Sequence, residues 1–545
     1  MRPAQWEYWL SQGGAQSFRA TCPNEYAMLM EGITCGVPID YLGDRTHTRE
    51  GRNPPVDAAG QAKIQKVIDA DVAAGKKAGP FDEPPLEHFN VSPVGAVPKK
   101  NGKIRVIHNL SYPFNGNSVN AGVVDIGYKL SRFGHAARAV RKFGRGCYLI
   151  KLDVEAAFKQ VPVRPEDWHL LGFKWLGKYF YERVLPFGLR SSCRLWELYA
   201  SALHHLFEKV MSVDGDPQRA HRVVIHYVDD FLFVVRDLES ARALLPVAKG
   251  VCNMLGLPMC DDKEEGPTQC LTFLGIELDT LQLQARLPVP KLQELKRLCS
   301  EWGAKSSATL REVQSLHGSL RFACAVVRPG RFQLGRIVAF MSGLMSFNPG
   351  RYARHKIPQT VRDEVKWWST FLESFNGVSI LYELEWTETA CIELFTDACE
   401  TGFGGIFGNR WFAGAWSPKQ RAASMVATAR SMPFFELYAL VTAAKIFGPS
   451  WRGKKITFRC DCDPVVQGVQ KGRSAKPQLM YLLRQLCEIG IAYQFDYRVI
   501  HIAGVKNVIA DCLSRFGDCA QFRALCPNAE AKGEPLPVLD LLPPQ

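Results

Sequence analysis

The segment VVIHYVDDFLFVV (residues 223–235) places two adjacent carboxylates, Asp229 and Asp230, in the middle of an apolar run. The β-branched and aromatic residues on both sides predict the two strands of a β-hairpin, with the aspartates at its two-residue turn. Neighbouring like charges repel, and because apolar surroundings screen this repulsion poorly, a divalent cation commonly compensates it. The alternative is an ordinary Asp-Asp turn with both carboxylates in water.

A third carboxylate, Asp153, ends the strand predicted at the start of YLIKLDVEAAFKQVPV (residues 148–163). Facing the acidic hairpin, it would complete the oxygen-rich ligand set that Mg²⁺ prefers. Between these segments, WELYASALHHLFEKV (residues 196–210) has the apolar spacing of a helix that covers one face of a sheet.

Four segments in this region resemble the palm of reverse transcriptases in their order and approximate spacing. They are LDVEAAF (residues 152–158), VLPFGLRSS (184–192), YVDD (227–230) and LTFLGIEL (271–278). The resemblance implies an RNA-directed DNA polymerase in which Asp153, Asp229 and Asp230 bind two Mg²⁺ ions, with Mn²⁺ as the alternative metal. It implies a less essential role for Asp230 than for the other two.

The segment SPVGAVPKKNGKIRVIHNLS (residues 92–111) is similar to the fingers hairpin of the same family, with an Asn-Gly turn. This similarity implies that Arg105, together with Lys99 or Lys100, contacts the incoming triphosphate. The alternative is that these residues are the solvated charges of an ordinary hairpin.

The resemblance also implies how the nucleotide is selected. Phe158 lies five residues after Asp153, at the place of the aromatic gate that excludes a 2′-hydroxyl, although it could instead be a plain core residue. Lys263 lies near a lysine that acts on pyrophosphate in the family. Two residues depart from the common pattern: Phe187 replaces the retroviral glutamine, and Cys193 replaces a proline.

A second set of acidic residues lies in the C-terminal third. Asp397 ends the predicted strand CIELFTDA (391–398), and Asp461 ends the predicted strand KITFRCD (455–461). Glu436 falls in the first turn of a helix predicted over residues 433–447, which begins with proline and is apolar nearly all round. Two alternatives remain open. Glu436 could cap its helix, and Asp463 rather than Asp461 could be the metal ligand.

The last part of this region, HIAGVKNVIADCLSR (residues 501–515), contains His501 and Asp511. The order of strands, helices and acids resembles ribonuclease H. The resemblance implies that Asp397, Glu436, Asp461 and Asp511 bind two metal ions, and that His501 assists proton transfer or product release. Asp511 could alternatively be a surface residue of the last helix.

These resemblances predict an α+β multidomain fold, in which a right-hand polymerase of fingers, palm and thumb precedes an RNase H-like α/β domain. The expected boundaries are 1–55 for an unassigned N-terminal extension, 56–287 for fingers and palm, 288–350 for thumb-like helices, 351–390 for a short connection, 391–516 for the RNase H-like domain and 517–545 for a disordered tail.

Composition is consistent with a globular protein that binds nucleic acid. The chain has 545 residues, a formal charge of +13 and 17 cysteines, and a basic excess favours a polyanionic partner. The cysteines include no CxxC pair, which predicts neither a zinc ribbon nor a disulfide scaffold but reduced thiols in an intracellular protein of the cytoplasm or nucleus. No apolar span and no signal-peptide pattern occur, so neither a membrane nor secretion is expected.

The sequence therefore predicts a reverse transcriptase with ribonuclease H activity that copies retroelement RNA into DNA. Its partners would be an RNA template, a DNA primer, an RNA–DNA hybrid and deoxynucleoside triphosphates. Segments such as VSPVGAVPKK and LHGSLRFACAVVRPGR resemble DIRS-like elements, with gypsy-like elements next. Two competing hypotheses are a decayed copy that binds nucleic acid without turnover and an RNA-dependent RNA polymerase.

Overall fold

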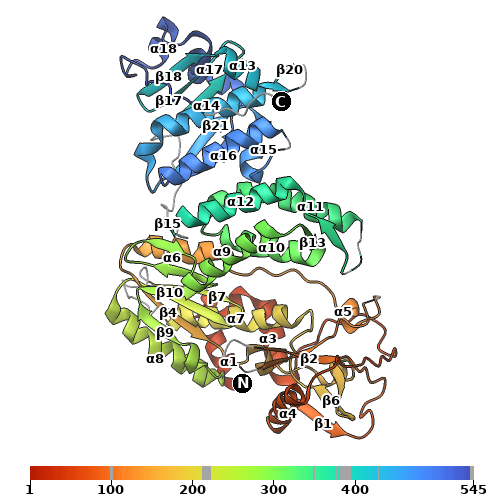
Figure 1. The fold of residues 1–545 in the computed structure, drawn as a ribbon. Helices are drawn as coiled ribbons and strands as arrows, with labels where there is room; N and C mark the ends of the chain where they lie inside the picture. The colour runs from red at the N-terminus through yellow and green to blue at the C-terminus, as the bar shows by residue number, and fades with distance from the viewer. Residues whose placement is uncertain are drawn as a thin grey trace. The chain divides into compact units, whose positions relative to one another are not determined.

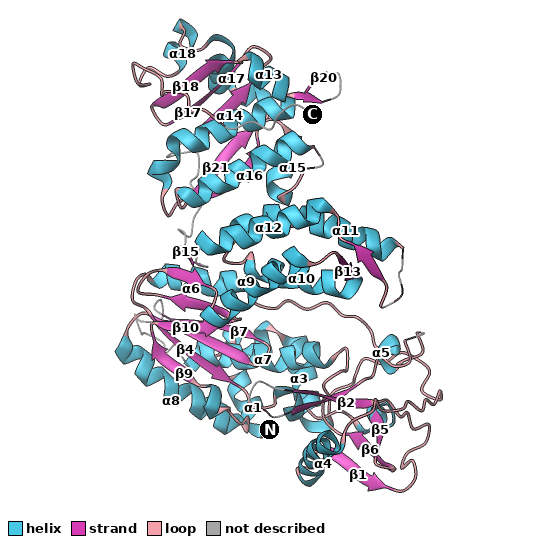
Figure 2. Cartoon of the chain, viewed as in Figure 1, coloured by secondary structure: helices cyan, strands magenta, loops and turns pink. Residues whose placement is uncertain are grey.

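The computed structural model is drawn by chain order in Figure 1 and by secondary structure in Figure 2. The described residues are 1–98, 102, 104–114, 116–210, 222–347, 350, 352–374, 378–380, 394–426, 429–474 and 476–539. They form two compact units. The first comprises Met1–Ala139 and Gly146–Leu271, and the second comprises Val140–Arg145 and Thr272–Gln545.

The N-terminal extension is part of the core of the first unit. Its helices are α1 (Pro3–Ser11), α2 (Phe18–Thr21) and α3 (Pro23–Cys35). Trp6 and Leu10 are fully buried, and Trp6 Nε1 donates a hydrogen bond to the Leu255 carbonyl oxygen at 3.2 Å. Because large apolar side chains gain most from burial, residues 1–55 stabilise the first unit rather than forming a separate appendage.

The palm is a four-stranded antiparallel sheet in the order β7-β8-β4-β9. Its strands are β4 (Tyr148–Asp153), β7 (Arg222–Tyr227), β8 (Asp230–Val235) and β9 (Glu265–Thr268). Helices α7 (Ser192–Val210) and α8 (Leu238–Leu255) pack against it, as Figure 1 shows. Most residues of β4 and β8 are buried, so this sheet lies at the centre of the unit.

The hairpin turn differs from the prediction by one residue. Tyr227 pairs with Asp230, so the two turn residues are Val228 and Asp229, and Asp230 begins β8. Val228 has a positive φ of 56°, the backbone conformation that short hairpin turns require. The prediction that both aspartates occupy the turn was therefore wrong for Asp230.

The fingers region consists of a two-stranded hairpin, a three-stranded sheet and one long helix. The hairpin is β2 (Val94–Pro98) with β3 (Ile104–His108), the sheet runs β1 (Lys77–Phe81), β6 (Lys178–Glu182), β5 (Gly172–Trp175), and the helix is α4 (Ala58–Ala73). Ile64 and Ile68 of α4 are fully buried against apolar residues of these strands. Helices α5 (Val119–Gly122) and α6 (Phe133–Phe143) precede β4.

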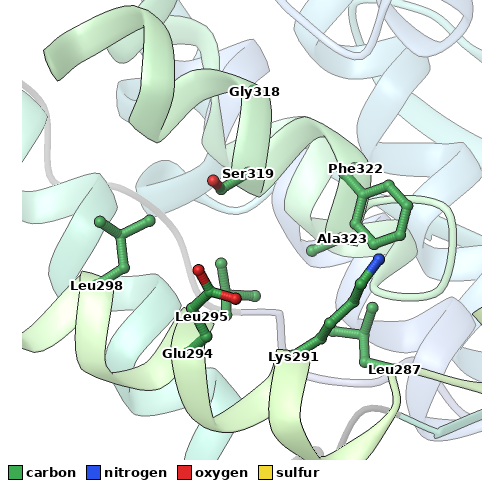
Figure 3. A pocket seen from close by; sticks show the side chains of 9 residues that line it. All are labelled: Leu287, Lys291, Glu294, Leu295, Leu298, Gly318, Ser319, Phe322 and Ala323. Carbon is green, nitrogen blue, oxygen red and sulfur yellow. The ribbon is translucent and has the colours of Figure 1, made fainter. Parts of the chain in front are cut away.

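The second unit begins with a small sheet and four helices. The sheet runs β10 (Cys270–Phe273), β11 (Ile276–Asp279), β12 (Gln284–Arg286), β15 (Val378–Ile380), and the helices are α9 (Val289–Ala304), α10 (Leu310–Ala323), α11 (Gly335–Ser346) and α12 (Gln359–Ser374). A cavity of about 290 Å³ lies between α9 and α10. Figure 3 shows it lined by apolar side chains such as Leu295, with Lys291 beside Phe322. It holds one carboxylate, Glu294, and so offers no paired acids for catalysis.

The C-terminal domain has a five-stranded sheet in the order β18-β17-β16-β21-β22. The antiparallel strands are β16 (Leu394–Ala398), β17 (Gly402–Phe407) and β18 (Arg410–Ala415), and β21 (Lys455–Cys460) and β22 (Asp496–His501) run parallel to β16. The helices are α14 (Met432–Phe447), α15 (Asp463–Lys471), α16 (Pro477–Ala492) and α17 (Val508–Phe516). This topology confirms the expected α+β multidomain fold with a C-terminal RNase H-like domain.

Two helices of this domain hold the central strands. Both α14 and α17 contact β16 and β17. Leu394 belongs to the apolar cluster that includes α14, whereas Phe395 belongs to the cluster that includes Leu513 of α17. Since side chains alternate along a strand, Asp397 shares its face with Phe395. The sequence prediction that α14 is buried all round is confirmed, because twelve of its residues are buried.

The expected disorder of the tail is wrong for residues 517–539, and 540–545 lie outside the described residues. Helix α18 (Ala520–Leu525) places Phe522, fully buried, against Trp411 of β18. The tail then follows the edge strand: Glu534 N donates to the Trp411 carbonyl oxygen at 2.7 Å, and Trp411 Nε1 donates to the Glu530 carbonyl oxygen at 2.9 Å. An edge strand leaves backbone groups unpaired, and the tail satisfies them.

Among the described helices, none combines the length and the apolar character that a membrane span requires.

Candidate active sites

The palm sheet brings its three predicted acids together through strand register. Asp153, at the end of β4, is the direct cross-strand partner of Asp230 at the start of β8. Asp229 precedes Asp230 in the turn, and its carbonyl oxygen accepts a hydrogen bond from Val154 N at 3.1 Å. Asp153 is 3% exposed, and Asp229 and Asp230 are half-buried. The site therefore presents three clustered carboxylates at one end of the sheet.

Burial and mutual repulsion raise the pKa values of two acids of this cluster. Burial, followed by the charge of Asp153, raises the pKa of Asp229. Burial, followed by the charges of Asp229 and Asp153, raises the pKa of Asp230 to about 6. Both shifts have the sign expected when carboxylates share poorly solvated space. Positive charge at this position would relieve the repulsion.

Part of that positive charge is built into the protein as Lys263. Its Nζ donates a hydrogen bond to Asp153 Oδ1 at 2.7 Å. Burial alone would lower the pKa of Lys263, but the hydrogen bond and the three nearby carboxylates raise it. The backbone reinforces this placement, because Cys260 N donates to the Asp153 carbonyl oxygen at 2.9 Å. The structure thus brings Lys263 directly to the acids.

Three side chains in contact, those of Arg105, Phe187 and Phe158, form a second part of this site. The Arg105 guanidinium carbon lies 4.4 Å from the centroid of the Phe187 ring, and the Phe187 and Phe158 centroids are 5.3 Å apart. Arg105 is exposed and lowers the pKa of Asp229, so its charge acts on the acid site. Sequence reasoning noted Phe187 only as a departure and missed this contact. Lys99 and Lys100 lie outside the described residues.

In the C-terminal domain, Glu436 and Asp461 come together with a thiol that the sequence prediction missed. One potential ligand atom each from Glu436, Asp461 and Cys460 lies within 4.8 Å of the others. Asp463, the alternative to Asp461, instead lies in the first turn of α15 with an exposed side chain. Burial, followed by the charge of Glu436, raises the pKa of Cys460, so this thiol stays neutral beside the acids.

Two polar residues, also missed, hold Asp397 in place. Ser514 Oγ donates to Asp397 Oδ2 at 2.6 Å, and Asn507 Nδ2 donates to Asp397 Oδ1 at 3.4 Å. Both donors are buried and come from the last part of the domain, within α17 or at its N-cap. A weak sequence signal was available, since Asn and Ser flank Asp511 in the quoted segment.

The pKa of Glu436 is raised further than that of Asp397. Helix α14 begins at Met432, with Ser431 as its N-cap and no acidic residue in its first turn, so the predicted first-turn position of Glu436 was wrong and a capping role is excluded. Burial, followed by the charges of Asp397 and Asp461, raises its pKa to about 9. Its Oε2 atom is buried without a hydrogen-bond partner among the described residues. An unpaired buried oxygen of this kind suits a cation.

The remaining predicted residues lie at the rim. Burial, together with the charges of Asp461 and Asp511 and against the hydrogen bond from Ser514, raises the pKa of Asp397 to about 6, so Asp511 is electrostatically part of the cluster. Asp511 is partly exposed and pairs with Arg515 at 2.7 Å. His501 is exposed at the end of β22, with Nε2 3.9 Å from Asp463 Oδ1. It contacts Asp463 rather than the buried acids.

Both clusters fit hard divalent cations. Each offers three or more carboxylates, and burial followed by the charges of neighbouring acids raises pKa values in both. Carboxylate oxygen is the ligand that Mg²⁺ and Mn²⁺ prefer. The neutral Cys460 thiol is a poor ligand for such ions and is best regarded as a neighbour of the C-terminal site.

Comparison with known proteins agrees with the palm. Residues 97–278 match the family model described as reverse transcriptase (RNA-dependent DNA polymerase). Polyprotein P3 of Commelina yellow mottle virus is 22% identical over 436 residues, which are 78% of this chain and 20% of that protein. The chain thus spans about a fifth of that relative. The family match supports a reverse transcriptase domain over residues 97–278.

Solved structures of foamy viral proteins are also similar. The protease-reverse transcriptase dRH in complex with double-stranded DNA has a TM-score of 0.49 and 15% identity, and covers 91% of this chain and 81% of its own. The protease-reverse transcriptase in complex with double-stranded DNA has a TM-score of 0.46 and 16% identity, covering 91% and 96% respectively.

Proposed function

We propose that this chain copies retroelement RNA into DNA and that its C-terminal domain hydrolyses RNA in RNA–DNA hybrids. The observation that carries the proposal is the pairing of Asp153 with Asp230 beside Asp229, inside the segment that matches the reverse transcriptase family. The substrates are an RNA template, a DNA primer and deoxynucleoside triphosphates. The formal charge of +13 suits such polyanions.

At the palm, Asp153, Asp229 and Asp230 would hold two Mg²⁺ ions, or Mn²⁺ in their place. When bound, these ions supply Lewis-acid stabilisation of the charge that develops on the transferred phosphoryl group. Lys263 orients Asp153 through its hydrogen bond and carries a proton toward the leaving pyrophosphate. Asp230 contributes mainly by its charge.

Selection and positioning of the nucleotide are assigned to Arg105, Phe187 and Phe158. Arg105 binds the triphosphate through its guanidinium group, which is suited to phosphate oxygens. Phe158 excludes a 2′-hydroxyl by steric contact. Phe187 lies between them and holds both in one orientation, so triphosphate binding and sugar selection use a common support.

At the C-terminal site, Asp397, Glu436, Asp461 and Asp511 would hold the metal ions for RNA hydrolysis. Ser514 and Asn507 fix the orientation of Asp397 by their hydrogen bonds. His501 accepts or delivers protons at the exposed rim. Exclusion of water is not required here, because water is the nucleophile.

The finer assignments rest on sequence resemblance. We assign the chain to the DIRS-like subgroup on the segments quoted above, with gypsy-like elements as the second choice. Copying of element RNA would take place in the cytoplasm or the nucleus.

The test is a pair of assays on three variants. The full chain extends a DNA primer on an RNA template with Mg²⁺ and deoxynucleotides, and cleaves the RNA of a preformed hybrid. Asp229→Asn abolishes extension and spares cleavage, whereas Asp397→Asn does the reverse. Asp262→Asn, an exposed aspartate next to Lys263, is the control that changes neither.

Three results would contradict the proposal. Loss of both activities in a folded Asp229→Asn protein would show that the sites are not separate. Hybrid binding by the wild-type chain without either reaction would identify a decayed copy instead. Equal use of ribonucleotides would favour an RNA-dependent RNA polymerase.

A further inference from the structure

Two cysteines outside both acidic sites lie next to each other. Cys512 lies in α17, Cys519 precedes α18, and their Sγ atoms are 3.5 Å apart. We propose that Cys512 and Cys519 form a reversible disulfide that clamps the C-terminal tail onto α17 when a low-molecular-weight disulfide is present. This modification site is independent of the proposed polymerase and nuclease activities.

The spacing of the two thiols brings their sulfur atoms close to bonding distance. A disulfide requires its sulfurs to approach to about 2.05 Å, and rotation of both side chains from a 3.5 Å separation covers such a distance. The two cysteines are seven positions apart in the sequence, so the closed loop is short. The described cysteines form no disulfide with one another in this structure.

The two thiols also differ in the way a disulfide exchange requires. Cys519 is partly exposed, so a small disulfide in solution can reach it, whereas Cys512 is 2% exposed. Cys519 Sγ accepts a hydrogen bond from Phe522 N at 3.5 Å. That bond, the largest influence, lowers the pKa of Cys519, and thiolate is the form that attacks. Cys519 is therefore the attacking thiol and Cys512 the resolving one.

The exchange balances with one molecule of glutathione disulfide. Cys519 loses its proton, attacks one sulfur of glutathione disulfide and releases one reduced glutathione, leaving a mixed disulfide on Cys519. Cys512 then loses its proton and attacks Cys519 Sγ, which breaks the mixed disulfide and releases a second reduced glutathione. The protein thiols are oxidised by two electrons in total, and the glutathione disulfide is reduced by two.

The bond would join helix α17 to the C-terminal tail, and these two segments have different roles in the domain. Helix α17 contains Asp511 and Ser514, whose hydroxyl holds Asp397. The tail beyond Cys519 covers the edge strand β18 through Phe522 and Glu534. Oxidation would thus fix the tail to the helix that supports the acidic site.

Trypsin separates the cysteines concerned into three peptides, which makes the test direct. Cleavage after Lys506, Arg515, Arg523 and Lys532 gives NVIADCLSR, FGDCAQFR and ALCPNAEAK, with Cys512, Cys519 and Cys526 in turn. The native full chain is incubated with glutathione disulfide, blocked with N-ethylmaleimide, digested and analysed by mass spectrometry. We expect NVIADCLSR linked to FGDCAQFR, with reversal by dithiothreitol. The exposed Cys35 and Cys270 remain outside any protein disulfide.

Variants distinguish this pair from the alternatives. Cys526→Ser leaves the link unchanged, and Cys512→Ser leaves a stable glutathione adduct on FGDCAQFR. The proposal is overturned if native wild-type protein carries glutathione on Cys519 without linking to Cys512, or if Cys519 links to Cys526. The wild-type digestion decides the question even if Cys512→Ser does not fold.

Discussion

The palm site and the C-terminal site use the same residue type in different structural settings. In the palm, Asp153 and Asp230 are paired on adjacent strands, and Asp229 lies in the connecting turn. Backbone register alone brings these three acids together. In the C-terminal domain, Asp397, Glu436, Asp461 and Asp511 come from β16, α14, the end of β21 and α17. That site forms only when four elements pack correctly.

The two sites also differ in their internal counter-charge. Lys263 donates to Asp153 at 2.7 Å in the palm. Among the described residues, no ion pair joins Asp397 or Glu436, and the nearby Arg515 is bonded to Asp511. Burial, followed by the charges of Asp397 and Asp461, raises the pKa of Glu436 to about 9, against about 6 for Asp230. The palm is partly neutralised before a metal arrives, whereas the C-terminal site depends on the metal for its charge balance.

The largest expected effect tests that dependence. Glu436→Gln removes a buried carboxylate of the C-terminal site and lowers hybrid cleavage roughly 10²–10³-fold, the loss typical of removing one group that stabilises developing charge. Primer extension stays unchanged. Glu488→Gln, at an exposed glutamate of α16 in the same domain, is the control. Cleavage within threefold of wild type would remove Glu436 from the site.

A smaller effect is expected from the palm counter-charge. Lys263→Ala leaves Asp153 without its ammonium partner and lowers primer extension about 10–100-fold, with partial recovery in Lys263→Arg. Lys249→Ala is the control, because Lys249 pairs with Asp261 and Glu264 but not with Asp153. An unchanged rate of primer extension in Lys263→Ala would show that the palm site, like the C-terminal site, needs no cation supplied by the protein.

Nucleotide selection belongs to the palm alone. Phe158→Ala opens space beside the sugar and lowers discrimination against ribonucleotides roughly tenfold, a magnitude typical of steric contacts. The ratio of kcat/KM for deoxynucleotides and ribonucleotides measures this change. Phe187→Leu removes the ring that lies between Arg105 and Phe158, and raises KM more than it changes selectivity. Unaltered selectivity in Phe158→Ala would exclude the gate.

Sequence reasoning found the acids because local patterns mark them. Strand-like apolar runs that end in Asp153 and Asp397 carry their own signal, and the hairpin is visible around Asp229. It could not find the register, which depends on the turn. Val228 adopts positive φ and shifts Asp230 from the turn into β8, a choice that the Asp-Asp pair does not specify.

Of the residues that support the acids, Lys263 was named only through the family resemblance, and Ser514 was missed. Lys263 lies 110 residues from Asp153 and Ser514 lies 117 from Asp397, so only tertiary packing joins them. The tail was misjudged for a related reason. Its composition suggests disorder, but the exposed edge of β18 supplies hydrogen-bond partners and Trp411 supplies an apolar contact for Phe522. Both the edge strand β18 and Trp411 lie outside the tail, so the sequence of the tail alone does not reveal these contacts.

The smallest effect concerns stability without metal. The pKa of Glu436 is raised from 4.5 to about 9 on folding. A raised carboxyl pKa gives stability that is fully present below the unfolded value and is lost as pH rises through the folded value. Glu436→Gln has no such loss. In EDTA, the free energy of unfolding of the variant should therefore gain on that of wild type from pH 4.5 upward, and the gain should keep growing until about pH 9.

The same comparison in the palm should level off earlier. The pKa of Asp230 is raised only from 3.8 to about 6, so the gain of Asp230→Asn should be complete just above pH 6 and remain smaller. Urea unfolding of both variants in EDTA between pH 5 and 9 measures the two profiles. Saturating Mg²⁺ should reverse both gains, because the wild-type carboxylates then bind the ion and the amides cannot. If the gain in unfolding free energy depends on pH in the same way for both variants, Lys263 does not neutralise the palm site better than the C-terminal site is neutralised.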